Sequence, residues 1–354
     1  MCALVDAYYD TDVLDGAAIY GKLSVARACY EQSLANGYAI ELLLETREEA
    51  VAVGADEIYP EEFAAVDEYA YESLDYFNAG GTQAEFDADI DNFDALYTSF
   101  AKAVELEDKY ALIIARGFDE YDVKNYNAGI DAVNDAYDIA YDTADGKAIL
   151  AKLKEADARY TTVLNNGYNI AFVLSLRENA ISYGAEEFFP EELYGVDEYA
   201  EGSLVAYNAG GTQDELDKDV DTCSYLYNSL IVAVDTQNAY DCIVENGYDE
   251  YDVKDVARGD KAVMEVYLLA AAPELDGIAI FETINVALNA YEQAITNCEA
   301  CLAVMAVRED AIDAGAEDYF PEEFAMVDDL AWDAVVSFNA GGSQDQLDAD
   351  IDNF

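Results

Sequence analysis

The sequence predicts an all-α protein, an elongated helical-repeat array in which long and short helices alternate. Three observations predict this fold class. The chain repeats itself with one long period, apolar residues recur at helical spacing, and helix-ending and helix-starting residues return at the same places in each copy. A hydrophobic fraction of 53% is enough for a continuous core despite the high charge.

One block of ten residues marks the period. The block GADEIYPEEF around Pro60 returns as GAEEFFPEEL around Pro190 and as GAEDYFPEEF around Pro321, at distances of 130 and 131 positions. In a repeat array each unit buries its apolar face against its neighbours. We therefore divide the chain into three repeat units, the last of them incomplete: residues 1–144, 145–275 and 276–354.

The first long helix is expected over residues 16–53. Asp15 supplies an N-cap, and apolar residues follow at helical spacing as far as Val53. A turn at Gly37 is the alternative, but the third copy has Cys298 at this place. A turn that requires positive φ would not readily accept a cysteine, so we predict one long helix.

The repeated block is predicted to be a joint between two helices. Its glycine suits a left-handed C-cap, its proline fits the first turn of the next helix, and two glutamates after the proline face the positive end of the helix dipole. These structural residues are Gly54, Gly184 and Gly315, and Pro60, Pro190 and Pro321. The short helix that follows ends at an Asn-Ala-Gly-Gly sequence.

A capping box is predicted to start the next long helix. The pattern of Ser or Thr followed three residues later by Glu or Gln appears in all three copies, at Thr82, Thr212 and Ser343. In the first copy this helix should run from about residue 83 to 115 and end at Gly117.

A finer period divides each unit into two halves. Gly117-Phe-Asp-Glu-Tyr and its counterpart at Gly247 echo the joint at Gly54, without the proline. Each half then consists of a long helix, a loop that opens on glycine, and a shorter helix. The short helix after Gly117 is expected over residues 121–141, starting late or broken at the Asn-Ala-Gly sequence that ends in Gly129.

The last residues, 348–354, match residues 87–93, after which the corresponding long helix continues in the first copy. A helix with an unpaired apolar stripe is a poor terminus for a repeat array. We expect the sequence to be a fragment of something longer or, as the second choice, a partner to complete the unit.

The charge excludes several classes of function. The chain has 76 acidic and 17 basic residues, a net charge of −59 and no histidine. Nucleic acid needs clustered lysine and arginine, and an anionic membrane surface would repel this chain. Without imidazole, Ser-His-Asp and Cys-His catalysis and histidine metal sites are excluded. The acids are expected to coat solvated helix faces, and a saline or cation-rich setting would screen their repulsion.

The six cysteines do not recur from unit to unit, so no repeated disulfide framework is predicted. Most should be small apolar fillers, and Cys298-x-x-Cys301, with no second pair, is interpreted in the same way rather than as a zinc or redox site. The sequence has no apolar run of membrane-spanning length and no basic, apolar secretion signal at its start. Cys2 would be the lipidated residue if a signal had been removed.

Three Asp-x-Asp-x-Asp runs look like the start of a calcium loop, but they lack the glycine and glutamate that an EF-hand needs and lie in a predicted helix. We interpret them as acidic helix faces that bind cations loosely at most. Their residues are Asp87, Asp89 and Asp91, Asp217, Asp219 and Asp221, and Asp348, Asp350 and Asp352. No metal site of high affinity and no cofactor is predicted.

Arg47, Arg177 and Arg308 occupy equivalent positions in a chain that has few basic residues. Binding of an anionic ligand is one interpretation, and bidentate pairing with carboxylates of neighbouring helices is the one we prefer. The 29 tyrosines suit helix–helix seams flanked by acids, with exposed rings for sugar or peptide binding as the alternative. Carboxylate pairs abound, but near-identical units offer no single place for catalysis.

The Gly-x-x-x-x-x-Pro-Glu-Glu-Phe entry and the Tyr/Ala/Leu stripes resemble tetratricopeptide-like helical repeat proteins. The chain is most similar in style to acidic Ala/Tyr-rich repeat proteins of spirochaete cell envelopes, many of which are lipoproteins. The resemblance covers the whole chain, but the strict tetratricopeptide period is absent. It implies an interaction protein of the cell envelope or the extracellular space.

We therefore expect a non-catalytic structural or interaction protein outside the cytoplasm, which self-associates end to end through the helix at residues 343–354. The alternative is a binding module that holds a glycan, peptide or divalent cation in a groove lined by tyrosines and acids. Partners would be proteins or further copies of the chain, with no nucleic acid and no membrane-spanning segment.

Overall fold

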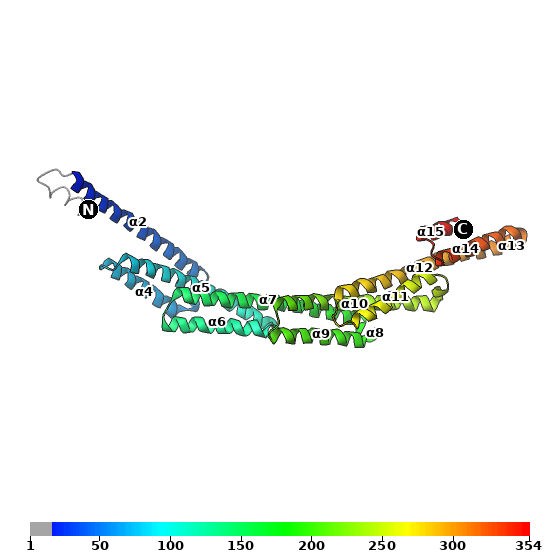
Figure 1. Cartoon of the computed structure of the whole chain (residues 1–354), viewed down its shortest axis with the longest axis horizontal. Helices are drawn as coiled ribbons and strands as arrows, with labels where there is room; N and C mark the ends of the chain where they lie inside the picture. Colours follow the sequence, from blue (N-terminus) through cyan, green and yellow to red (C-terminus); the bar gives the residue numbers. More distant parts are fainter. Residues whose placement is uncertain (1–15) are drawn as a thin grey trace. The chain divides into compact units, whose positions relative to one another are not determined.

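The computed structural model describes residues 16–354, and the regular structure of this part is entirely helical (Figure 1). Cys2 and Asp15 lie outside the described residues. The long helices are α2 (Gly16–Ala52), α5 (Gln83–Arg116), α7 (Gly146–Tyr183), α10 (Gln213–Asn246) and α12 (Gly277–Asp313). The shorter helices are α4 (Pro60–Asn78), α6 (Val123–Asp142), α9 (Pro190–Asn208), α11 (Val253–Ala270), α14 (Pro321–Asn339) and α15 (Gln344–Asn353). The predicted alternation of long and short helices is thus confirmed.

The predicted joints are present, with one addition. Gly54, Gly184 and Gly315 have φ angles of 84°, 111° and 86°, so each ends its helix in the left-handed region that favours glycine. Each proline of the block begins the next short helix at its first turn. Between glycine and proline the chain forms one further helical turn: α3 (Ala55–Ile58), α8 (Ala185–Phe188) and α13 (Ala316–Tyr319). After Gly247 a 3₁₀ turn, η1 (Tyr248–Glu250), takes this place.

The capping boxes are complete in two of the three copies. Thr82 and Thr212 accept a hydrogen bond from the backbone N–H three residues on, and the glutamate there accepts one from the backbone N–H of the threonine. The prediction is wrong in part at Ser343. Its hydroxyl accepts from Gln346 N, but the Gln346 side chain donates to Asp350 instead of completing the box.

Helix α6 is continuous through Gly129, so the predicted break there is wrong. The glycine serves close packing rather than a turn. A Cβ atom on Gly129 would lie 2.3 Å from the ring of Tyr160, and one on Gly259 of α11 would lie 2.2 Å from Tyr291. Helix α2 passes through Gly37 without interruption, as predicted.

The chain forms two compact units, residues 1–167 and 168–354. The three repeat units based on the sequence period stay a prediction. In the first compact unit, α5 takes part in two helix groups. Its first half packs with α4 and the second half of α2, and its second half packs with α6 and the first part of α7, up to residue 167. A long helix therefore belongs to two successive three-helix groups.

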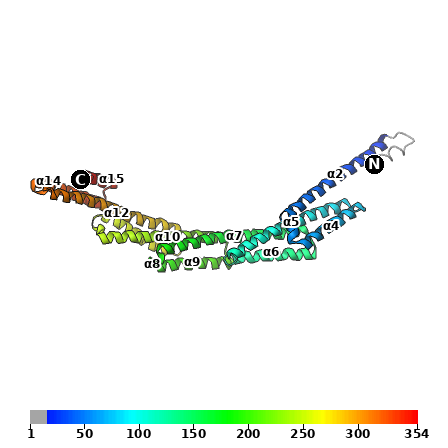
Figure 2. The same ribbon diagram turned by 180° about the vertical axis from the view of Figure 1, so that it is seen from behind.

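The second compact unit repeats this arrangement. The α7 residues from Tyr168 on pack with α9 and the first half of α10, around a core that contains Val173, Leu193 and Tyr227. The second half of α10 runs beside α11 and the first half of α12, which Figure 2 shows from behind. In the third group the second half of α12 packs with α14 and with the short α15.

The first half of α2 has an apolar face that its unit leaves uncovered. Leu23 and Tyr30 are 42% and 57% exposed, whereas the equivalent α7 residues, Leu153 and Tyr160, are 6% and 3% exposed. The ribbon in Figure 1 shows this half of α2 extending beyond α4 and α5. In α7 and α12, by contrast, the equivalent half lies in a three-helix group.

Candidate interaction surfaces

A repeated ion pair ties each long helix to the short helix after it. Arg47 donates through Nε and Nη2 to the two carboxylate oxygens of Asp67, at 2.7 and 2.6 Å. Arg177 does the same to Asp197, and Arg308 to Asp328, at distances of 2.7 to 2.8 Å. The predicted bidentate pairing of these arginines is confirmed. We call each such pair an Arg–Asp clamp.

In two copies a tyrosine completes the clamp from the next long helix. The hydroxyl of Tyr97 donates to Asp67 Oδ1 at 2.7 Å, and Tyr227 makes the same bond to Asp197. Burial raises the pKa of Asp67, but the hydrogen bonds from Arg47 and Tyr97 outweigh burial and leave the pKa below its ordinary value. Burial and the bond to Asp67 raise the pKa of Tyr97. The clamp thus joins three helices through one carboxylate.

A buried polar node holds the second kind of joint. Asp122, at the start of α6, accepts from Asn125 and from Asn166 of α7, the latter at 2.7 Å. In the second unit, Asp252 accepts from Asn297 of α12 at the same distance. Because buried polar atoms must be paired, such nodes fix the register of neighbouring helices.

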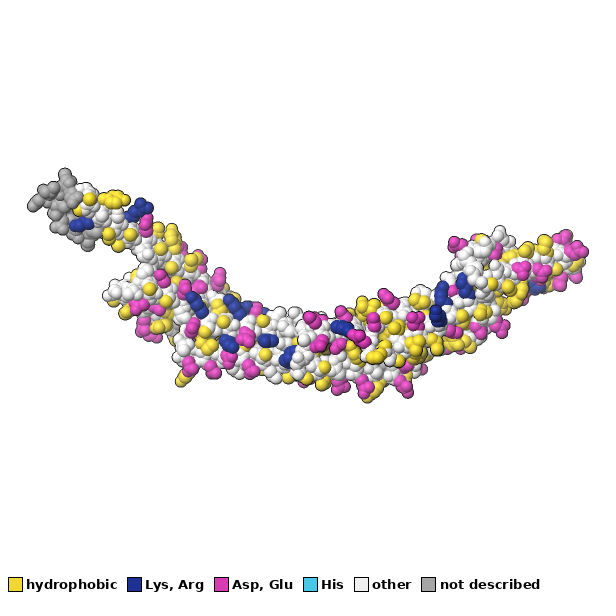
Figure 3. Space-filling view, viewed as in Figure 1, with side chains coloured by type: hydrophobic (Ala, Val, Ile, Leu, Met, Phe, Trp, Pro, Cys, Tyr) yellow, Lys and Arg dark blue, Asp and Glu magenta, His cyan; other side chains and the backbone are white. Residues whose placement is uncertain are grey.

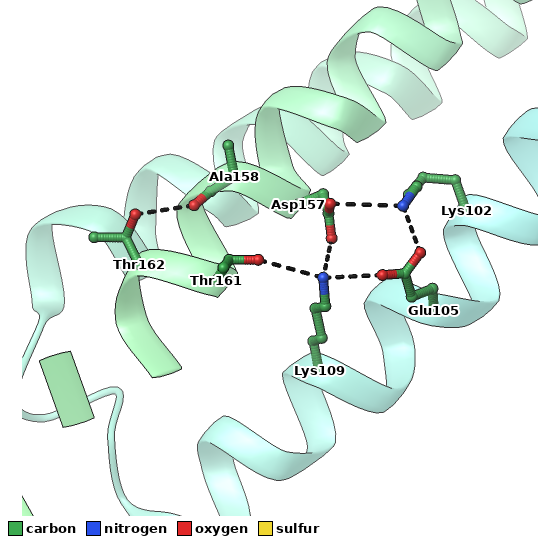
Figure 4. A network of polar contacts seen from close by, with 7 residues as sticks. All are labelled: Lys102, Glu105, Lys109, Asp157, Ala158, Thr161 and Thr162. Carbon is green, nitrogen blue, oxygen red and sulfur yellow. Dashed lines mark hydrogen bonds and ion pairs between the residues drawn. The ribbon is translucent and has the colours of Figure 1, made fainter. Parts of the chain in front are cut away.

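Lysines of α5 form a further network with α7 (Figure 4). Lys109 contacts Asp157 and Glu105, the latter at 2.9 Å, and Lys102 lies 3.5 Å from Asp157. Thr161 accepts a hydrogen bond from Lys109 at 3.3 Å. Hydrogen bonds from the two lysines hold the pKa of Glu105 below its ordinary value. This cluster of charges connects α5 with α7.

The predicted acidic runs are spread along helices and engaged singly. Asp87, Asp217 and Asp348 accept from the glutamine one turn earlier, Asp91 pairs with Lys147, and Tyr199 donates to Asp219. Asp89 accepts from Ser73, and Asp350 accepts from Gln346. Within residues 16–354, no three acidic or cysteine residues are arranged to hold a metal ion. The remaining two, Asp221 and Asp352, lie on α10 and α15 respectively. Loose cation binding by the nine aspartates stays a prediction.

The cysteines between residues 16 and 354 are free thiols. Cys223 and Cys298 are buried, and burial raises the pKa of each thiol to about 12. These two fill apolar positions, as predicted, and Cys298 donates weakly to the carbonyl oxygen of Tyr248 at 3.4 Å. Cys301 is half-buried and Cys29 is exposed.

A pocket of about 690 Å³, half open to solvent, lies in the second unit among α9, α10, α11 and α12, and we call it the cavity. Its wall is mostly aliphatic, with aromatic rings from Tyr240, Tyr267 and Tyr291. The hydroxyl of Tyr291 donates to Asp260 Oδ1 at 2.7 Å, which places one carboxylate at the wall. This size and composition are typical of sites for small molecules. The sequence pattern does not reveal the cavity, because the cavity depends on the sizes of the apolar side chains that face it and not on their spacing.

A second hollow of about 750 Å³ is an open groove between α12, α14 and α15. Its lining includes Ala311, Phe324, Val327 and the Arg308–Asp328 clamp, together with Leu347 of α15. We call it the α12–α14 groove. Figure 3 shows acidic side chains scattered over the visible face of both units with hydrophobic ones between them.

Comparison with protein-family models, with curated proteins and with solved structures finds no match. The resemblance to helical repeat proteins therefore holds for the all-helical, repeating architecture, and no family is assigned. Within residues 16–354, no helix has the length and apolar character needed to cross a membrane.

Sequence reasoning could have found the partner of each clamp arginine. An aspartate stands 20 positions after the arginine in all three copies, at Asp67, Asp197 and Asp328. This constant spacing separates them from the many other acids of the chain. The completing tyrosine likewise stands 30 positions after the aspartate in the two copies that have it.

Proposed function

We propose that this protein is a non-catalytic structural or interaction protein, an acidic helical-repeat scaffold outside the cytoplasm that associates end to end. The observation that supports it best is the α12–α14 groove. The groove presents apolar side chains such as Val327 and Trp332 at the surface, and an exposed apolar patch of this kind marks an interaction site.

The polar groups of the molecule favour a scaffold for a second reason. The clamps, the Asp122 and Asp252 nodes and the Lys109 network all use their charges and hydrogen bonds between helices. Such groups stabilise an architecture rather than present reactive atoms to a substrate. The net charge of −59 would keep separate copies apart at low ionic strength and allow association when salt screens it.

Light scattering over a range of protein and salt concentrations tests association. We expect the mass of the assemblies to increase with protein concentration and with salt concentration. The increase should be smaller in Val327→Asp, which places a charge in the groove. Met264→Asp is the matched control, since Met264 is an exposed apolar residue at the cavity. A strict monomer under all conditions would contradict the scaffold. Labelling of intact cells with an antibody tests the location outside the cytoplasm.

The 690 Å³ cavity supports a second candidate, a binding module. Tyrosine rings beside the Asp260 carboxylate suit a glycan or a peptide, because the rings stack on apolar faces and the carboxylate accepts hydrogen bonds. Calorimetry with glycans, peptides and Ca²⁺ tests this candidate. Heat that disappears in Leu230→Phe, which narrows the cavity, would support it, and absence of heat with all three would count against it.

A further inference from the structure

The cavity of the second unit lacks a hydrogen bond that its counterpart in the first unit has. There the hydroxyl of Tyr59 donates to Glu107 at 2.7 Å and so ties the chain between α3 and α4 to α5. The equivalent residues of the second unit are Phe189 and Gln237, and both line the cavity. Because a phenylalanine has no hydroxyl to donate, this bond cannot form at the cavity.

A carboxylate lines the cavity where the first unit has an apolar side chain. The residue is Asp260 of α11, and its equivalent in α6 is Ile130. Among residues 16–354, the side chain that donates to Asp260 is Tyr291, whose hydroxyl lies 2.7 Å from Oδ1. The second oxygen, Oδ2, can therefore accept a hydrogen bond from a ligand. The second unit thus combines an open space with a charge that the first unit lacks there.

The charged side chains of the cavity wall are all acidic. In the described part of the chain they are Asp260 and Glu192, and the wall contains neither lysine nor arginine. Both acidic residues are exposed, whereas Leu230 and Ile284 of the wall are buried. The cavity therefore has a negative mouth and an apolar interior, which favours a cation with an apolar body. Among residues 16–354, no three acidic or cysteine side chains are arranged to hold a metal ion, so we consider an organic cation.

Tyrosine rings lie next to the Asp260 carboxylate. Tyr291 contacts the carboxylate through its hydroxyl, and the ring of Tyr240 lies 5.5 Å from the ring of Tyr291. Both tyrosines line the cavity. An aromatic face attracts an organic cation through its quadrupole, and this attraction adds to that of the carboxylate. The apolar body of the cation would bury surface against Leu230 and Ile284.

We propose that the cavity binds a small amphiphilic amine, a molecule with one protonated amino group and an apolar body. The ammonium group donates to Asp260 Oδ2 beside the tyrosine rings, and the apolar body lies against the aliphatic wall. A volume of about 690 Å³ is within the range of small-molecule sites. This ligand class goes beyond the proposed function. It belongs neither to the scaffold nor to a module for glycans, peptides or divalent cations, and it does not depend on end-to-end association.

Calorimetry with three alkyl compounds of equal chain length tests the charge of the ligand. The probes are octylamine, octanol and octanoate, each titrated into the whole protein at about 0.15 M salt, where attraction to distant surface charges is screened. We expect saturable binding of octylamine at one site, about tenfold tighter than binding of octanol. Octanoate should not bind, because its carboxylate meets the negative mouth.

Variants of the protein locate the site. Asp260→Asn removes the charge and keeps an oxygen that accepts the Tyr291 hydroxyl. It should weaken octylamine about tenfold, the usual effect of removing a hydrogen bond to a charged group, and leave octanol binding unchanged as a sign that the wall is intact. Glu265→Gln is the matched control, since Glu265 is an exposed acid of the same helix outside the cavity wall. Leu230→Phe, which narrows the cavity, should abolish binding of octylamine and octanol.

Three results would overturn the inference. The first is octylamine binding that is absent or no tighter than octanol binding. The second is an equal loss in Glu265→Gln and Asp260→Asn, which would indicate attraction to the acidic surface in general. The third is undiminished binding in Leu230→Phe, which would place the ligand elsewhere.

The proposed function fails in a different way. A strict monomer in light scattering would contradict the scaffold and leave the amine site intact. Binding of a glycan at the cavity without binding of octylamine would favour the second candidate function and reject the amine site.

Discussion

The helix group of α5, α6 and the first part of α7 and the group of α10, α11 and α12 have the same fold but different interiors. Both keep a glycine under a tyrosine ring, at Gly129 and at Gly259, and an aspartate that accepts from an asparagine. The two helix groups differ in the side chains that face the neighbouring three-helix group. The repeat thus preserves the contacts that set helix spacing and varies the rest.

In the first unit an aromatic cluster fills that space. The ring of Phe100 lies 5.2 Å from Phe63 and 6.0 Å from Tyr59, and the hydroxyl of Tyr59 donates to Glu107 at 2.7 Å. In the second unit the equivalents of Phe100, Leu106 and Glu107 are a leucine, a threonine and a glutamine: Leu230, Thr236 and Gln237. All three line the cavity. Leu230 and Thr236 are smaller than the phenylalanine and leucine at the equivalent positions, which leaves space at the cavity.

The largest expected effect comes from adding a methyl group at the glycine that packs against each tyrosine ring, Gly129 or Gly259. Gly129→Ala should destabilise the α6 region by about 2–3 kcal/mol, because overpacking forces side chains from their rotamers. Gly259→Ala should cost less, about 1 kcal/mol, since Tyr291 borders the cavity and its ring has space to move. Hydrogen exchange of α6 and α11 peptides measures both.

Both tyrosines pack against a further tyrosine ring, Tyr291 against Tyr240 at 5.5 Å and Tyr160 against Tyr110 at 6.2 Å. They differ behind that ring, because Tyr240 lines the cavity whereas Tyr110 stacks on Tyr126 at 6.1 Å. Equal losses in the two variants would show that the cavity does not relieve the packing. A gain of stability in Gly129→Ala, as helix propensity alone predicts, would contradict the close contact itself.

The second comparison concerns a buried amide in one group and a buried acid in the other. Asn125 donates to Asp122 at 2.9 Å, and at the equivalent position Asp255 lies beside Asp252. Burial, and next the Asp252 charge, raise the pKa of Asp255, although Arg258 and Lys254 oppose this. Asn125→Asp should therefore destabilise the first unit by about 2 kcal/mol at neutral pH, as a donor is lost.

The reverse change, Asp255→Asn, should stabilise the second unit at neutral pH. A raised folded pKa means that the unfolded chain ionises first, so the stability of the wild type falls as pH rises from the ordinary carboxyl pKa through the raised one. The advantage of Asp255→Asn should grow over this window and vanish in more acidic solution. Denaturant unfolding of both proteins at several pH values measures it, and a constant difference would refute the assignment.

Local signals in the sequence predict the helices well and their partners poorly. Helix α2 ends at Ala52 against a predicted end at residue 53, since Gly54 must adopt a positive φ. The sequence period does not predict that each long helix is shared between two groups. A period shows which segments are equivalent, but it does not show which helices contact one another. Gly129 was predicted as a helix break because the contact that explains the glycine comes from another helix. The Tyr160 ring of α7 lies where a Cβ atom of residue 129 would be.

The candidate surfaces were predictable to a different degree. The pairing of Arg47, Arg177 and Arg308 with acids followed from their chemistry, and the constant spacing to the aspartates would have completed it. The cavity was beyond prediction. Its lining comes from four helices, and replacement of Phe by Leu within an apolar stripe leaves the helical pattern of the sequence unchanged.

The smallest expected effect comes from exchanging the side chains at two equivalent positions, Leu230 at the cavity and Phe100 in the aromatic cluster of the first unit. Leu230→Phe should add about 1 kcal/mol of stability to the second unit, because the ring buries apolar surface in existing space. Phe100→Leu should remove about 1 kcal/mol from the first. Opposite signs in denaturant unfolding would establish that the same helical frame supports a filled and an open interior. A loss in Leu230→Phe would instead mean that the cavity's walls are fixed in shape, as a preformed ligand site requires, and would favour the binding module over the scaffold.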